Sequence, residues 1–127
     1  MRKTIITLAA LAVTAAVPAS ASAAGANFVT PGAAAYCATD EDSGDYLVCW
    51  TPNDGFTVGM YWAGRSGKRY ERANRHYRTH AGRTLRSGQT WRGPNGFTCV
   101  STRDGLTCTN ARGHGWWLGR YVGYRMF

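Results

Sequence analysis

Four cysteines constrain this chain more than any other feature, because they fall into two pairs that are close in sequence. Eleven residues separate Cys37 from Cys49, and eight separate Cys99 from Cys108. Four cysteines allow three pairings, and the count alone does not choose between them. Zinc sites are typically built from short C-x2-C knuckles, which neither spacing provides. We therefore expect disulfides rather than a metal site.

Hairpin geometry favours pairing each cysteine with its nearest neighbour. Two β-prone runs, 97–101 and 106–110, flank a four-residue loop that ends in Gly105. With Gly105 in the left-handed conformation, Cys99 lies directly opposite Cys108. Opposed residues of a non-hydrogen-bonded pair are close enough for a disulfide. The register therefore predicts a Cys99–Cys108 bridge.

The first pair follows the same logic, since Cys37 and Cys49 are symmetric about Ser43. Residues 42–44 (Asp-Ser-Gly) suit a three-residue turn whose glycine needs a positive φ. Each bridge closes a short loop and should stabilise the fold by roughly 2–3 kcal/mol. The acidic residues around this turn fit turn formation better than calcium binding, because Gly44 falls where an EF-hand loop needs a ligand.

The first 23 residues have the pattern of an export signal. A basic pair at 2–3 precedes an apolar run over 5–17, and Ala-Ser-Ala at 21–23 provides the small-x-small site of signal peptidase. The run is shorter than the about 20 apolar residues of a membrane anchor, and no second such run follows. We expect a signal peptide over 1–23 and a single secreted, extracellular domain over 24–127, where cysteines oxidise.

Removal of that segment lowers the net charge from +8 to +6 and leaves a domain poor in aliphatic side chains. Four Leu and five Val remain in 104 residues, beside all sixteen aromatics. The hydrophobic core of such a chain is only marginally stable, and covalent cross-links are usually needed to stabilise the fold. We expect a mainly β fold: a small disulfide-stapled domain of hairpins with at most one or two short helices.

Local patterns place the elements. Strand signals cover 46–50, 56–62, the 97–110 hairpin and 121–127. Apolar spacing over 68–81 fits a short helix with an arginine face, and a basic loop fits it nearly as well. Two stretches have similar sequences, Pro-Asn-Asp-Gly-Phe-Thr at 52–57 and Pro-Asn-Gly-Phe-Thr at 94–98, and we call this similarity the short echo. Either a duplication or the repeated use of a turn followed by a strand would produce it.

Charge is segregated along the chain. The segment 65–92 contains nine Lys and Arg but only one acid, Glu71, whereas 37–54 contains five acids and no base. Guanidinium groups bind phosphate bidentately, and tyrosine rings stack on bases or sugars. The candidate polyanion-binding residues are Arg69, Arg72, Arg75, His76, Tyr77 and Arg78. The expected partner is an extracellular polyanion (nucleic acid, teichoic acid or anionic lipid); a solvated basic surface is the competing interpretation.

Catalysis has weaker support. Glu71 with His76 or His80 would supply the acid and base of a small ribonuclease, although all three crowd one segment. His76 and His80 lie four apart, as metal ligands on a helix do, but they lack an evident third ligand and have arginine neighbours. Phosphate loops, nucleophile elbows and metalloprotease motifs are missing from the sequence, so no cofactor is expected.

Near the C-terminus, the segment 113–117 (Gly-His-Gly-Trp-Trp) places two large aromatics beside a histidine. Exposed tryptophans bind sugars and membrane interfaces, but a domain this poor in aliphatics also needs them as core. We assign one of the two to the core and leave the other open.

Two stretches resemble an uncharacterised family of small secreted actinobacterial proteins. Residues 28–32 (Phe-Val-Thr-Pro-Gly) match its N-terminal element. Residues 97–120 resemble its motif F-x-C-x-S-x-x-G-[LV]-T-C-x-N…G-H-G-[FW]-x-L-x-R, with one extra residue between Ser101 and Gly105. The resemblance implies export and a disulfide-bonded β-rich domain, without a reaction. Many members of that family carry another cysteine pair in the middle, where this chain has its arginine-rich segment.

These observations favour a secreted, non-enzymatic binding module that takes anionic surfaces or polymers. A small secreted hydrolase of the ribonuclease kind and a secreted protease inhibitor are the alternatives.

Overall fold

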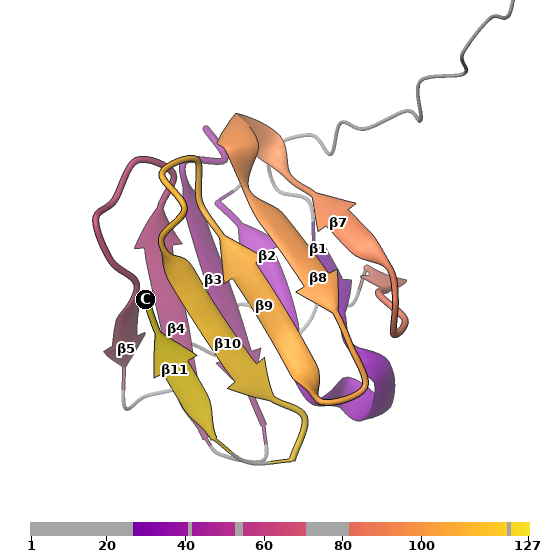
Figure 1. Cartoon of the computed structure of the whole chain (residues 1–127). Helices are drawn as coiled ribbons and strands as arrows, with labels where there is room; N and C mark the ends of the chain where they lie inside the picture. The colour runs from indigo at the N-terminus through magenta and orange to yellow at the C-terminus, as the bar shows by residue number, and fades with distance from the viewer. Residues whose placement is uncertain (1–26, 41, 53–54, 71–81, 122) are drawn as a thin grey trace, which may run out of the picture.

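Two antiparallel β-meanders face each other in the computed structural model, which describes residues 27–40, 42–52, 55–70, 82–121 and 123–127 (Figure 1). The first meander forms sheet A together with one added strand, and the second forms sheet B. The fold is therefore mainly β, as predicted. Among the described residues, no helix is long and apolar enough to span a membrane.

Sheet A has the strand order β5-β4-β3-β2-β1-β6. Its strands are β1 (Asn27–Val29), β2 (Tyr36–Thr39), β3 (Tyr46–Thr51), β4 (Phe56–Tyr61), β5 (Lys68–Tyr70) and β6 (Arg83–Thr84). All neighbouring strands are antiparallel except β6, which runs parallel to β1.

Sheet B is a five-stranded antiparallel meander with the order β11-β10-β9-β8-β7. Its strands are β7 (Thr90–Arg92), β8 (Thr98–Ser101), β9 (Gly105–Thr109), β10 (Gly115–Gly119) and β11 (Tyr124–Met126). Two 3-10 turns, η1 (Pro31–Ala33) and η3 (Pro94–Gly96), connect β1 to β2 and β7 to β8.

Both disulfide predictions are confirmed. Cys37 lies opposite Cys49 on β2 and β3, and Cys99 lies opposite Cys108 on β8 and β9. In each bridge the Cα atoms are 4.1 Å apart, the close spacing of a non-hydrogen-bonded pair.

The turns differ from the predictions in their details. Gly44 has the expected positive φ of 69°, but the turn is wider than three residues, since the last ladder bond runs from Asp40 N to Tyr46 O. Gly105 is not left-handed; it is the first residue of β9 and faces Gly119. A Cβ at position 105 would collide with the Leu118 carbonyl oxygen, so glycine is needed there for close strand approach.

Neither alternative for 68–81, a short helix or a basic loop, holds at the start of the segment, because Lys68–Tyr70 form strand β5. The free edge of β4 offers hydrogen-bond partners, and Thr57, Val58 and Gly59 pair with this segment. Tertiary pairing thus outweighs the local helical spacing. The rest of this segment, 71–81, lies outside the described residues.

The centre of the core is a stack of the two disulfides. The sulfur atoms of Cys37, Cys49 and Cys108 lie within 4.8 Å of one another, so the bridge of sheet A contacts that of sheet B. All four cysteines are buried and none is free, which leaves no thiolate for a metal. Phe28 and Trp91, with ring centroids 5.0 Å apart, pack on one side of this stack.

The two meanders repeat one plan. In sheet A a single register row crosses Phe28, Cys37, Cys49 and Val58. In sheet B the corresponding row crosses Trp91, Cys99, Cys108 and Trp116. In both, the disulfide joins the second and third strands of the meander.

The first connection of each meander is also equivalent. η1 and η3 both open with proline, and their second residues, Gly32 and Asn95, are both left-handed, with φ of 68° and 56°. The short echo at 52–57 and 94–98 does not reflect this repeat, because the two stretches connect different pairs of strands. Repeated turn-then-strand chemistry accounts for the echo.

Removal of either disulfide should destabilise the domain similarly, because each closes a loop of comparable length, with separations of 12 and 9 residues. We expect Cys37→Ala/Cys49→Ala and Cys99→Ala/Cys108→Ala each to lower the free energy of unfolding by about 2–3 kcal/mol. Urea unfolding followed by tryptophan fluorescence measures this loss. A loss below about 1 kcal/mol for either pair would contradict a central role for the bridge.

Candidate functional site

The predicted polyanion-binding residues lie almost entirely outside the described residues. Arg69 is on β5, paired with Val58 at the edge of sheet A, and its side chain is not described. The others (Arg72, Arg75, His76, Tyr77 and Arg78), together with Glu71 and His80 of the ribonuclease hypothesis, fall within 71–81. The polyanion and hydrolase hypotheses for this segment therefore stay predictions.

The acidic turn is a structural element held by Asp40. Its Oδ2 accepts hydrogen bonds from Ser43 N (3.0 Å) and Ser43 Oγ (2.7 Å), and its Oδ1 accepts one from Tyr46 N (2.8 Å). Desolvation alone would raise the pKa of Asp40, but these bonds and one from Gly44 N lower it from 3.8 to about 2. Asp40 therefore serves turn formation, as expected for this cluster.

Because the folded pKa of Asp40 lies below its unfolded value, its ionised form stabilises the fold above about pH 4. That contribution should disappear as the pH falls through about 2. We expect Asp40→Asn to lower the free energy of unfolding at neutral pH by up to about 1 kcal/mol, a small value because the turn is exposed. The variant should also show a flatter pH dependence between about 4 and 2.

Urea unfolding across this pH range measures the effect. Asp42→Asn is the matched control. Asp42 is exposed in the same turn, and its substitution removes the same charge. Equal effects of the two substitutions would show that net charge, rather than the hydrogen bonds of Asp40, sets the pH dependence.

Asn110, within the C-terminal motif, joins the two sheets at one end of the sandwich. Its Nδ2 donates to the backbone oxygens of Tyr61 (3.1 Å) and Gly64 (2.8 Å) in the β4–β5 turn. Its Oδ1 accepts from the backbone N–H groups of Arg112 (2.9 Å) and His114 (3.1 Å). All four hydrogen-bonding positions of this buried amide are therefore used, and the asparagine of the motif has a structural role.

Replacement of Asn110 by Ala should lower the free energy of unfolding by about 2–4 kcal/mol, because buried backbone groups lose their partners. Thr109→Ala, at the neighbouring half-buried position, should cost about 1 kcal/mol or less. Chemical denaturation of the two variants provides the comparison. Similar losses would argue against Asn110 as the link between the sheets.

The surface best suited to ligand contact is the outer face of sheet B, which faces the viewer in Figure 1. Strand alternation turns Cys99, Cys108 and Trp116 into the core, so their neighbours along each strand point outward. The outward side chains, all exposed or half-buried, are Thr90, Arg92, Thr98, Val100, Thr107, Thr109, Trp117 and Arg125. This set, the outer face of sheet B, contains no acidic residue.

One register row crosses the whole face. It runs from Thr90 through Val100, Thr107 and Trp117 to Arg125. The row thus presents hydroxyl, methyl, indole and guanidinium groups in line across five strands, a span suited to an extended ligand.

Trp117 and Arg125 form the most organised part of this face. The Arg125 guanidinium carbon lies 5.1 Å from the centroid of the Trp117 ring, a cation–π contact. A side chain at Gly105 would meet Trp117 Nε1 at 3.0 Å, so the glycine leaves room for the indole. Stacking restricts the guanidinium while its in-plane N–H groups remain available for an anion.

Within the described part of the chain, no Arg or Lys forms an ion pair with a carboxylate. Arg92 and Arg125 are both exposed. Their charges are therefore not neutralised by any carboxylate that the structure describes, and an anion approaching the outer face of sheet B meets positive charge.

Of the two adjacent tryptophans, one lies in the core, as predicted. Trp116 is completely buried beside the disulfides, whereas Trp117 is half-buried on the outer face. The sequence argument did not identify this face, although a signal was available. Residues on either side of a buried strand cysteine must point outward, which places Thr98, Val100 and Thr107 on one surface.

Comparison with family models, with curated proteins and with solved structures finds no match for this chain.

Proposed function

We propose that the chain is an exported, non-enzymatic binding module whose outer face of sheet B holds an anionic glycopolymer. Export is supported by the signal pattern over 1–23, by the family resemblance, and by two disulfides, which persist in oxidising compartments. The observation that carries the binding proposal is the stacked Trp117–Arg125 pair on a face that holds four threonines and no acidic residue.

A sugar-containing polyanion fits this face better than the other partners. Indole faces stack on sugar rings, threonine hydroxyls exchange hydrogen bonds with sugar hydroxyls, and guanidinium groups bind phosphate, sulfate or carboxylate. Binding of single-stranded nucleic acid commonly uses several stacking aromatics, whereas this face has one. Lipid binding would favour an apolar patch, and Val100 is the only aliphatic side chain of the face.

The test is retention of the disulfide-bonded protein on immobilised heparin, a sulfated glycan, over a salt series. If the contact is electrostatic, log affinity falls linearly with log salt, with a slope of about −0.7 to −0.9 per contact. Arg92→Gln/Arg125→Gln should reduce that slope by up to about two units. Trp117→Ala should weaken binding by roughly tenfold while the slope is kept.

The matched control is Arg65→Gln/Arg112→Gln, which removes two exposed charges outside the outer face of sheet B. If this control loses as much retention as Arg92→Gln/Arg125→Gln, net charge alone explains binding and the face is not the site. A single-stranded oligonucleotide and anionic vesicles are the competing probes, and stronger retention of either would replace the glycopolymer.

The arginine-rich segment is tested in the same assay. Replacement of Arg72, Arg75 and Arg78 together by Ala should reduce the salt slope by up to about two or three units if that segment also contacts the polymer. If the triple variant elutes with the parent, the segment is a solvated basic surface.

A further inference from the structure

The two exposed arginines of the outer face of sheet B lie at its opposite edges. Arg92 is on β7 and Arg125 is on β11, the two outermost strands of the sheet. Four strand-to-strand intervals of about 4.8 Å separate these strands, so the two residues lie about 19 Å apart across the sheet. A single phosphate, sulfate or carboxylate group is therefore too small to contact both.

The two arginines also belong to different register rows. Arg125 is opposite Trp117, in the row that ends at Thr90, whereas Arg92 is opposite Thr98, in the neighbouring outward row. Neighbouring outward rows are two residues apart along a strand, a distance of about 7 Å. The line that joins the two arginines therefore crosses the five strands obliquely, and a ligand laid along the strands meets only one of them.

The face carries no charged side chain between these two edges. Its centre, formed by the outward side chains of β8 and β9, consists of two directly opposed pairs, Thr98 with Thr109 and Val100 with Thr107. Gly115 of β10 continues the row of Thr98 and Thr109 without a side chain, since a Cβ there would collide with a carbonyl oxygen of β9. The centre of the face is therefore neutral, with threonine hydroxyls as its polar side-chain groups.

The two charged edges are not equivalent. The Arg125 guanidinium stacks on the Trp117 ring, with 5.1 Å from its carbon to the ring centroid, so this edge combines a restricted cation with an indole. Arg92 is exposed, and its register partner Thr98 has only a short side chain. The Trp117–Arg125 edge therefore supplies the first contact, and Arg92 adds a second one only to a ligand that reaches it.

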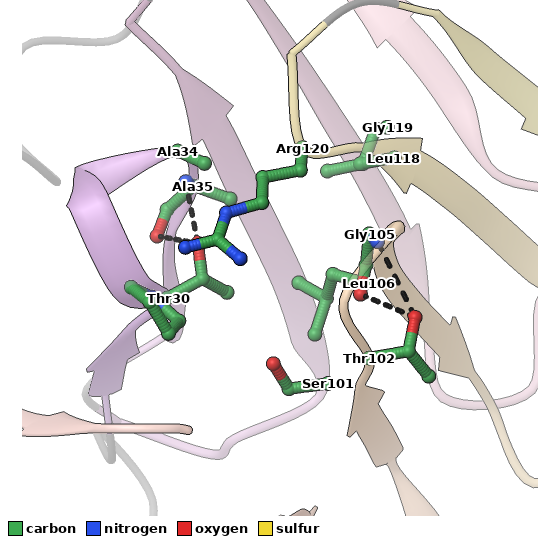
Figure 2. A pocket seen from close by; sticks show the side chains of 11 residues that line it. Thr30, Ala34, Ala35, Ser101, Thr102, Gly105, Leu106, Leu118, Gly119 and Arg120 are labelled. Carbon is green, nitrogen blue, oxygen red and sulfur yellow. Dashed lines mark hydrogen bonds between the residues drawn. The ribbon is translucent and has the colours of Figure 1, made fainter. Parts of the chain in front are cut away.

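A hollow at one end of the sandwich does not offer a glycan an alternative site. Thr30, Ser101 and Arg120 are among the residues that line it (Figure 2). The space has room for about one water molecule, so a sugar ring does not enter it. Figure 2 also shows the Arg120 side chain extending toward Thr30 and Ala35 of sheet A, so its charge is directed away from the outer face of sheet B.

We infer that the outer face of sheet B selects a glycan segment that crosses all five strands, with one anionic group at each arginine and sugar hydroxyls over the threonines between them. This inference rests on the proposed function and adds the length, direction and charge spacing of the ligand. Anionic groups about 20 Å apart on one polymer satisfy Arg92 and Arg125 together. Anionic groups placed between these positions gain no cationic partner on the face.

The experiment compares a heparin disaccharide with a heparin hexasaccharide, by calorimetric titration of the disulfide-bonded protein at fixed ionic strength. The disaccharide is too short to reach from Arg125 to Arg92, whereas the hexasaccharide spans that distance. The hexasaccharide should bind roughly tenfold more tightly, because the second contact forms within a complex already held at Trp117 and Arg125. Its salt slope should not exceed about two, the value for two contacts, although the probe carries many sulfates.

Three single substitutions separate the two edges of the face. Arg92→Gln should weaken hexasaccharide binding by roughly three- to tenfold and disaccharide binding by less than about twofold. Arg125→Gln should weaken the binding of both probes, since both use the edge that contains Trp117. Arg65→Gln is the matched control, because it removes one exposed charge in the β4–β5 turn, and it should change neither affinity by more than about twofold.

Equal effects of Arg92→Gln on the two probes, or no effect on either, would overturn the inference, since the face would then not discriminate ligand length. A salt slope of about four or more for the hexasaccharide would also overturn it, because charge density rather than the two arginines would set the affinity. In both cases retention of polymeric heparin by the parent would still support the proposed function. Absence of that retention rejects the proposed function itself, and this inference with it.

Discussion

The contact between the two disulfides is the constraint on which the structure depends. The domain over 24–127 has few aliphatic side chains, and although its four leucines are all buried in the core, the two disulfides and several aromatic rings supply much of the remaining contact between the sheets. The bridges fix the register of β2 on β3 and of β8 on β9, and their mutual contact fixes how the sheets face each other. A one-residue slip in either hairpin would turn a bridge outward and separate the sheets.

The same constraint explains why two dissimilar sequences repeat one plan. Each meander needs a cysteine on its second and third strands, and each opens its first connection with a proline followed by a left-handed residue. The side chains that fill the ends are not constrained in this way. Phe97 fills one end, whereas the equivalent position at the other end is the small Ala35, so the two ends differ where the repeat is imperfect.

Sequence reasoning succeeded where a short-range geometric rule applied and failed where pairing was long-range. Hairpin symmetry predicted both disulfides, because a cysteine pair and its turn lie within one local unit. Lys68–Tyr70 became a strand because the edge of β4 accepts it, a partner that helical spacing cannot reveal. Gly105 was assigned to turn conformation, whereas its role is close approach to the Leu118 carbonyl of β10. In both of these failures the deciding contact was with a strand distant in sequence, β4 for Lys68–Tyr70 and β10 for Gly105.

The candidate sites were harder to predict than the fold for a related reason. A charge run such as 65–92 is visible in sequence, whereas the outer face of sheet B collects Arg92, Trp117 and Arg125 from three strands. Burial of the cysteines and Trp116 turns the neighbouring threonines and Trp117 outward, so the core pattern itself generates the face. Gly105 contributes to this face, since its lack of a side chain makes room for the Trp117 indole. A side chain there would collide with the Leu118 carbonyl oxygen and crowd the indole, so the close approach of β9 and β10 also determines how the face presents Trp117.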